Sequence, residues 1–227
     1  MNKSKKLLVE ELIEKGYNEG KAENYEGEIK YFTRVIELSP DNIEAYKYRG
    51  FSYVEFKKYE EGIKDYTKYI ESKNDCEIVY HNRGLAYYNL DRYDEALKDF
   101  TKSIELNKNY SESYLRRGNI YFEKEKFNDA IKDYTKVIDL KPDDVGAYYE
   151  RGNTYYKLKK YNNAIEDYNK FIEINPDYSP VYNNRGLSYN MIGCLKEATE
   201  DYYKALELDP SDEKAQRNLS RVLGMLN

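Results

Sequence analysis

The sequence contains few of the residues from which disulfide frameworks, metal sites and catalytic triads are built. Its 227 residues include no tryptophan, one histidine and two cysteines, Cys76 and Cys194, which lie far apart along the chain. Neither a disulfide framework nor a zinc site is indicated, and we expect no metal or other cofactor. A Ser-His or Cys-His arrangement would have to centre on His81, the only histidine, so we expect no enzymatic activity.

Long apolar runs are also missing. The N-terminus has a basic start, but its apolar run, residues 7–9, is shorter than the core of a secretory signal. No segment approaches the length of a membrane span, so we expect a cytoplasmic protein that has no membrane partner. The net charge of −5 argues against nucleic acid as a partner, because phosphate binding requires a basic face.

The chain does contain a repeat. A fixed period in the range of about 20–50 residues indicates a stacked-repeat architecture, and we expect a single solenoid domain over residues 1–227. The period is 34 residues and is marked by Gly16, Gly50, Gly84, Gly118, Gly152 and Gly186. The six predicted repeats span residues 9–42, 43–76, 77–110, 111–144, 145–178 and 179–212.

Each repeat has the pattern of two amphipathic helices joined by a short turn. In the first helix, positions 4, 8 and 11 carry an aromatic residue, glycine and an aromatic residue, as in Tyr148, Gly152 and Tyr155. This spacing places all three on one helix face, and close approach of a neighbouring helix explains the glycine. The second helix carries a small residue at position 20, such as Ala164, which we expect to face the glycine. An aromatic residue follows at position 24.

These positions, with a proline at position 32 of four repeats, resemble the tetratricopeptide repeat family over 204 of the 227 residues. The resemblance implies an all-α fold, an α-solenoid of helix-turn-helix repeats in a right-handed superhelix. It also implies a concave face, lined mainly by the first helices, that binds an extended peptide or a partner helix. The first repeat departs from the pattern at Glu19 and Glu28, and residues 213–227 are expected to form a capping helix.

Arginine at position 7 and aspartate at position 23 recur in five repeats. We interpret them as a structural ladder of ion pairs between helices, with the arginine stems on tyrosine rings, because residues used in every copy usually serve the copy itself. The expected pairs are Arg49 with Asp65, Arg83 with Asp99, Arg117 with Asp133, Arg151 with Asp167 and Arg185 with Asp201.

The candidate binding residues are those that vary between repeats. The resemblance places positions 2, 5, 6, 9, 12 and 13 of the first helix on the concave face. There, asparagine amides can pair with a peptide backbone and aromatic rings can anchor a ligand. The predicted peptide-binding groove consists of Lys47, Phe51, His81, Asn82, Tyr88, Arg116, Asn119, Phe122, Tyr149, Asn153, Tyr156 and Asn184. Alternatively, Tyr88, Phe122 and Tyr156 simply cover neighbouring helices.

We therefore predict a non-enzymatic protein–protein interaction scaffold whose partner is a protein or peptide. One alternative is a structural repeat protein that self-associates through its repeat ends or a tyrosine-rich outer face, given its 28 tyrosines. Another is a co-chaperone-like adaptor, in which Lys47, Asn82 and Arg116 form a degenerate clamp for a C-terminal carboxylate. Phe51 and Glu112 occupy two clamp positions where the family has asparagine and lysine, and Glu112 would repel a carboxylate.

Overall fold

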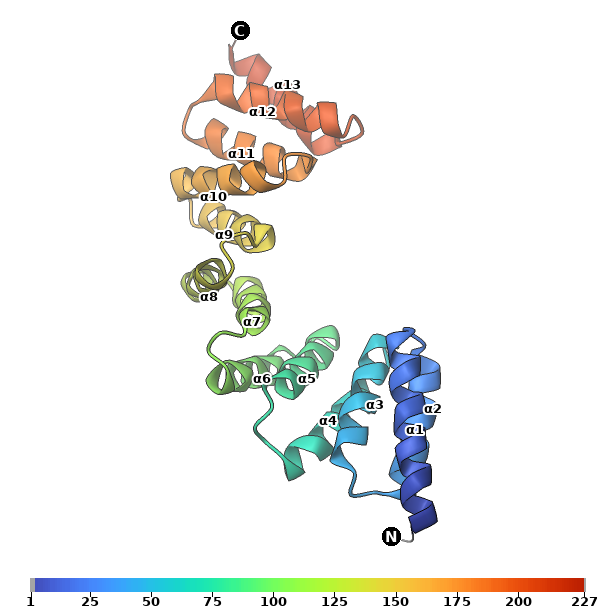
Figure 1. The fold of residues 1–227 in the computed structure, drawn as a ribbon. Coiled ribbons are helices and arrows are strands. Elements are labelled where there is room, and N and C mark those ends of the chain that lie inside the picture. Colours follow the sequence, from blue (N-terminus) through green and yellow to red (C-terminus); the bar gives the residue numbers. More distant parts are fainter. Residues whose placement is uncertain (1–2, 227) are drawn as a thin grey trace. The chain divides into compact units, whose positions relative to one another are not determined.

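The computed structural model describes residues 3–226, which fold into thirteen α-helices and contain no strand (Figure 1). The prediction of an all-α fold is confirmed. None of these helices is both long and apolar enough to cross a membrane. The helices are α1 (Lys3–Lys21), α2 (Tyr25–Leu38), α3 (Ile43–Glu55), α4 (Tyr59–Ser72), α5 (Glu77–Asn89), α6 (Tyr93–Leu106), α7 (Ser111–Glu123), α8 (Phe127–Leu140), α9 (Val145–Lys157), α10 (Tyr161–Ile174), α11 (Ser179–Met191), α12 (Leu195–Leu208) and α13 (Glu213–Leu226).

The helix boundaries follow the same 34-residue period as the sequence. From α3 onward, each odd-numbered helix begins 34 residues after the previous one, and the even-numbered helices do the same from α2. The odd-numbered helices up to α11 are the first helices of the predicted repeats, and the even-numbered helices are the second. The number of repeats and the right-handed superhelix stay predictions.

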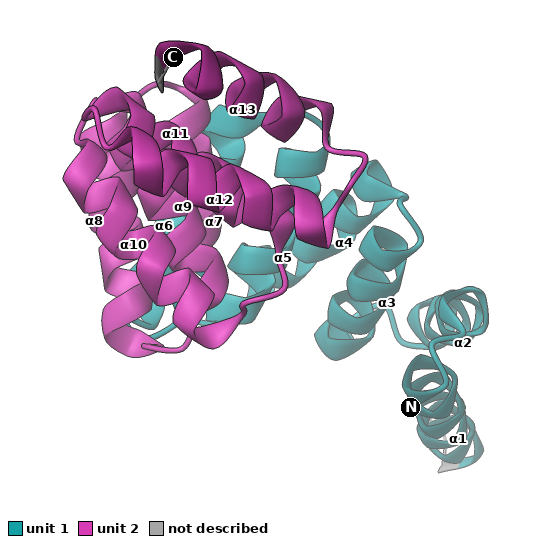
Figure 2. Ribbon diagram, turned by 90° about the horizontal axis from the view of Figure 1, so that it is seen from above, with its two compact units in different colours: residues 1–113 teal, residues 114–227 magenta. Residues whose placement is uncertain are grey.

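The chain forms two compact units, which we call unit 1, residues 1–113, and unit 2, residues 114–227 (Figure 2). In unit 1, α1 packs against α2, α3 against α4 and α5 against α6. In unit 2, α9 packs against α10, and α11 packs against α12. The assignment of the whole chain to a single solenoid domain stays a prediction.

Each first helix ends in the predicted short turn, whose left-handed conformation the sequence analysis did not predict. At the end of α9, the Lys159 N–H donates to the Tyr156 carbonyl at 2.9 Å, and the Lys160 N–H donates to the Tyr155 carbonyl at 2.9 Å. These two bonds form a Schellman motif, which requires a left-handed residue after the helix. That residue has φ between 56° and 83° at Glu23, Lys57, Asp91, Glu125, Lys159 and Gly193. In five of the six turns, therefore, a residue with a side chain adopts a conformation that glycine adopts more readily.

The glycines at position 8 allow the close packing of the two helices in each pair. A Cβ atom built on Gly152 would lie 2.8 Å from the Tyr168 ring, and one built on Gly50 would lie 3.1 Å from the Tyr66 ring. The prediction of close helix approach is therefore confirmed, although the closest neighbour is the aromatic ring at position 24. The small residue at position 20 meets the glycine backbone, since a Cβ atom built on Gly62 would lie 3.1 Å from the Gly50 carbonyl oxygen.

The predicted ladder of ion pairs is confirmed in all five copies. In one of them, Arg151 donates to both carboxylate oxygens of Asp167 at 2.9 and 2.7 Å, and its guanidinium lies over the rings of Tyr148 and Tyr155. Its Nη1 atom also donates to Thr135 Oγ1 of α8 at 3.0 Å, so the pair joins three helices. The same two-point pairing joins Arg49 to Asp65, Arg83 to Asp99, Arg117 to Asp133 and Arg185 to Asp201.

Helix α13 covers the C-terminal end of unit 2, as predicted for a capping helix. Its Leu219 and Val222 are buried in a cluster with Ala198 and Tyr202 of α12. On its other side, the Asn218 amide donates to Asn183 of α11 at 2.9 Å. The apolar face of α12 is thereby shielded from water.

Candidate functional site

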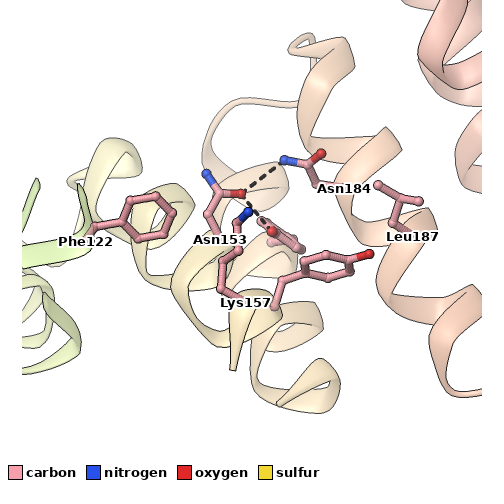
Figure 3. Close-up of a pocket in the computed structure, with 7 residues that line it drawn as sticks. Phe122, Asn153, Lys157, Asn184 and Leu187 are labelled. Atoms are coloured by element: carbon pink, nitrogen blue, oxygen red, sulfur yellow. Dashed lines mark hydrogen bonds between the residues drawn. The ribbon is translucent and has the colours of Figure 1, made fainter. Parts of the chain in front are cut away.

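Four of the predicted groove residues meet at one pocket, which we call the unit 2 pocket (Figure 3). Phe122 comes from α7, Asn153 and Tyr156 from α9, and Asn184 from α11, so three successive first helices contribute. The pocket has a volume of about 210 Å³ and is completed by Lys157, Tyr168 and Leu187. Its size suits one side chain of a larger ligand rather than a whole small molecule.

Hydrogen bonds fix the orientation of the asparagine amides in the unit 2 pocket. The carbonyl oxygen of Asn153 accepts from the Tyr168 hydroxyl at 2.8 Å and from the Asn184 amide at 3.1 Å. Figure 3 shows the amide nitrogen of Asn153 turned away from these two bonds. Asn184 also donates to the Tyr149 hydroxyl at 3.1 Å. The two amides are therefore held by the protein before any ligand arrives.

Burial raises the pKa of three ionisable groups around these amides. Burial raises the pKa of Glu150, and a hydrogen bond from Asn153 offsets part of this effect. Burial likewise raises the pKa of the Tyr149 and Tyr156 hydroxyls above the ordinary tyrosine value, which already lies well above neutral pH. The exposed Lys157 carries the positive charge of the lining. The pocket therefore offers amide hydrogen bonds and aromatic surface.

Three of the predicted groove rings also have a packing role. Tyr88, Phe122 and Tyr156 each contact the aromatic residue that begins the following helix. The ring centroids lie 5.6 Å apart for Tyr88 and Tyr93, 5.6 Å for Phe122 and Phe127, and 5.5 Å for Tyr156 and Tyr161. All three remain half-buried, and Phe122 and Tyr156 line the unit 2 pocket as well. Packing and pocket lining therefore coexist in these two residues.

Three other predicted residues, Lys47, Phe51 and Asn82, line a hollow of about 750 Å³ in unit 1, which we call the unit 1 groove. It is completed by Tyr17, Gly20, Lys21, Glu28, Tyr48, Cys76 and Ile78. Lys47 forms an ion pair with Glu44, which already neutralises part of the charge that a carboxylate clamp would use. Arg116, the third member of the predicted clamp, belongs to unit 2 and is exposed on α7.

His81 does not face a groove, contrary to the prediction from its position in the repeat. The residue is only 5% exposed, and its Nδ1 atom lies 2.8 Å from Ser113 Oγ. Its ring packs against those of Phe100 and Tyr110. The bulky ring of Tyr110 covers position 5 in this repeat, so His81 belongs to the core between helices.

The remaining predicted residues lie around these sites. Asn119 accepts from the Tyr134 hydroxyl at 2.9 Å and thus repeats the arrangement of Asn153 and Tyr168 one period earlier. The Tyr149 ring packs against Phe171 and borders a second hollow of about 400 Å³, which is lined mainly by α11, the loop before α13 and the start of α13. The accessible face that these asparagines share is formed by the first helices.

The predicted set of groove residues left out three residues of the unit 2 pocket, Lys157, Tyr168 and Leu187. Tyr168 occupies position 24 and was interpreted as a packing residue only, yet its hydroxyl reaches the asparagine amides. Lys157 and Leu187 occupy positions 13 and 9, which the family resemblance already assigned to the concave face. Glu28 of the unit 1 groove was noted as a departure from the pattern but not as a groove residue.

The chain was compared with protein families and known proteins. The tetratricopeptide repeat profile matches residues 78–110, 145–178 and 179–212, and a second profile, described as TPR repeat, matches residues 118–159. Together these matches cover more than half of the chain. A search of curated proteins found no match.

Several solved structures have a similar fold. YrrB, described as a TPR protein with an unusual peptide-binding site, shares 19% identity over 82% of this chain and 96% of its own, with a TM-score of 0.74. The C-terminal part of a TPR repeat-containing protein from Cytophaga hutchinsonii shares 21% identity over 91% of this chain and 83% of its own, with a TM-score of 0.78. MamA from Desulfovibrio magneticus RS-1 shares 21% identity over 76% of this chain and 98% of its own, with a TM-score of 0.71. These likenesses concern the fold.

Proposed function

Because the chain belongs to the tetratricopeptide repeat family, we propose that it is a protein–protein interaction scaffold that binds an extended peptide on the face of its first helices. The unit 2 pocket carries this proposal, since Phe122, Asn153 and Asn184 reach it from three successive first helices. The peptide-binding site in the description of YrrB, a protein of similar fold, supports the same class of ligand.

The chemistry of the unit 2 pocket suits a peptide backbone. An extended peptide presents N–H and carbonyl groups in alternation, and asparagine amides can pair with both. Because the protein already holds Asn153 and Asn184 in place, little side-chain entropy is lost when the ligand binds. Tyr156 and Leu187 supply the apolar surface against which one ligand side chain would pack.

We propose binding without catalysis. The only histidine, His81, is buried with Ser113, and that serine is fully buried, so a substrate has no access to the pair. The self-associating alternative receives little support, because only two tyrosines, Tyr178 and Tyr203, are among the exposed large hydrophobic residues in the described part of the chain. The other tyrosines do not supply a broad exposed apolar face.

A peptide selected from a random library against the full chain tests the proposal. Asn184→Ala should weaken the binding of that peptide about tenfold, the effect of losing one or two hydrogen bonds in a partly desolvated site. This variant is preferable to Asn153→Ala, because Asn153→Ala would leave the buried Tyr168 hydroxyl without its acceptor. Isothermal titration measures both affinities.

Asn163→Ala is the matched control, since Asn163 is exposed on α10 and does not line the pocket. It should bind the selected peptide as the unmodified chain does. Equal affinity in the Asn184→Ala variant, with its helicity preserved, would remove the unit 2 pocket from the proposed binding face.

A further inference from the structure

The unit 1 groove differs in chemistry from the unit 2 pocket. Its walls come from α1, α2, α3 and the beginning of α5, all within unit 1. Aromatic and aliphatic side chains dominate these walls, and two of them, Phe51 and Ile78, are 40% and 47% exposed. The groove also contains a carboxyl group that has no counterpart in the other helix pairs.

That carboxyl group belongs to Glu28, which is only 3% exposed and lines the groove. Its Oε2 atom is buried and has no hydrogen-bond partner. Position 20 carries a small residue in the other five repeats, namely Gly62, Ala96, Ala130, Ala164 and Ala198. The helix packing therefore needs no carboxyl group here, and an unpaired buried acceptor costs stability.

Gly20 makes the room that Glu28 occupies. A Cβ atom built on Gly20 would lie 2.7 Å from the Glu28 carboxyl carbon and from its Oε1 atom. The equivalent position in the four following repeats carries a larger side chain: Val54, Tyr88, Phe122 or Tyr156. On α1, glycine therefore occupies a position at which the following repeats have a larger residue. On α2, glutamate occupies a position at which they have a small one. The space left by the missing side chain on α1 is filled by the glutamate side chain.

The chain itself gives Glu28 one polar neighbour. Burial raises the pKa of the Glu28 carboxyl, and the nearby Ser52 hydroxyl offsets part of this effect. The single hydroxyl proton of Ser52, however, is donated to the Tyr48 carbonyl at 3.0 Å. A strong donor for the carboxyl group would have to come from a molecule that enters the groove.

The surroundings favour a positively charged donor with an apolar stem. The Tyr17 and Tyr48 rings pack edge to face with centroids 4.7 Å apart, and the Lys47 ammonium already lies 4.6 Å from the centre of the Tyr48 ring. This aromatic surface therefore accepts a cation. Residues 1–113 contain 19 lysines and arginines against 23 aspartates and glutamates, so unit 1 carries most of the net negative charge of the chain.

We propose that the unit 1 groove binds a basic side chain, lysine or arginine, of a partner segment, with its aliphatic stem on Tyr48 and Phe51 and its charged end on Glu28. The inference rests on the proposed function, because it requires that a partner segment lie on the first helices. The two lysines of the groove do not prevent a further positive charge from binding. Lys47 is paired with Glu44, and Lys21 lies exposed at the end of α1.

Two capped pentapeptides test this inference, one with lysine at its centre between leucines and one with norleucine in the place of the lysine. Titration of the ¹⁵N-labelled full chain, followed by NMR, measures both affinities. The unmodified chain should bind the lysine peptide about tenfold more tightly than the norleucine peptide, and Glu28→Gln should abolish that preference. Glu26→Gln, an exposed change in the same helix turn, should leave it intact.

Several results would overturn the inference: equal binding of the two peptides by the unmodified chain, no binding of either, or an unchanged lysine preference in Glu28→Gln. Glu28→Ala supplies a second folded variant, since alanine occupies this position in four of the other five repeats. It should lose the preference as well. The peptide selected against the full chain should still depend on Asn184. Equal binding of the two pentapeptides would therefore contradict only this inference, whereas an unchanged affinity of the selected peptide for Asn184→Ala would contradict the binding face proposed above.

Discussion

At the scale of single residues, the chain contains both buried and exposed ion pairs. The side chains of Arg151 and Asp167 are 16% and 6% exposed, whereas those of Lys170 and Glu173 on the same helix, α10, are 56% and 61% exposed. When a buried charge loses its partner, water cannot take the place of that partner, whereas an exposed charge is solvated by water. The buried pairs should therefore determine stability, although the exposed pairs are more numerous.

Asp167→Asn should lower the free energy of unfolding by about 3 kcal/mol, because the Arg151 guanidinium then lacks a negative partner in a partly dry position. Urea unfolding followed by circular dichroism measures the change. Glu173→Gln, which breaks the exposed pair on the same helix, should cost at most about 1 kcal/mol. Similar losses in the two variants would contradict a structural role for the ladder.

Glu28→Gln should stabilise the protein at neutral pH, and the gain should shrink in acid. Burial raises the pKa of Glu28 above its ordinary value of 4.5, so the unfolded chain loses this proton at a lower pH than the folded chain. The free energy of unfolding therefore falls as pH rises from about 4.5 toward the folded pKa, and the glutamine variant escapes this loss. Urea unfolding of both proteins at about pH 4 and about pH 7 checks the sign. A difference that does not change with pH would contradict it.

The residues that recur in every repeat could be predicted from the sequence, but several functional details could not. Period and spacing identified the Arg–Asp pairs, and the family resemblance placed Phe122, Asn153 and Asn184 on one face. They did not reveal that Tyr110 buries His81, because that depends on a side chain from the loop after α6. The amide orientation of Asn153 depends likewise on the hydroxyl of Tyr168, a residue whose ring was assigned to packing.

At the scale of elements, each helix pair is set by a glycine in its first helix and an aromatic ring in its second. Gly152→Ala should cost about 1–3 kcal/mol, because the new methyl group would lie 2.8 Å from the Tyr168 ring and the helices would have to separate. Gly224→Ala on α13 meets nothing within 4 Å and should stabilise by up to about 1 kcal/mol. Thermal unfolding compares the two variants. A neutral or stabilising Gly152→Ala would contradict this account of the packing.

Helix ends were predicted less well than helix interiors. Prolines 40, 142, 176 and 210 follow second helices, but α4 and α6 end at the same register with Asn74 and Lys108 in the place of proline. The position at which a second helix ends therefore does not depend on the proline alone. The left-handed turn after each first helix was not foreseen, because five of its six copies carry a side chain and so give no glycine signal.

At the scale of the whole molecule, the proposed scaffold should act as a monomer. Of the tyrosines, only Tyr178 and Tyr203 are strongly exposed, and most others pack against arginines or other rings, so the described residues offer little tyrosine surface for self-association. Sedimentation velocity at several concentrations should give one species near 27.1 kDa. A mass that increases with concentration would instead favour the self-associating structural protein.

The central claim is that a peptide binds on the face of the first helices. The most direct test maps a library-selected peptide onto the ¹⁵N-labelled full chain by NMR. We expect the largest shift changes at Asn153, Asn184 and their neighbours on α7, α9 and α11, which line the unit 2 pocket. Changes confined to the exposed residues of α8, α10 and α12 would contradict the claim, because they would place the ligand on the second helices.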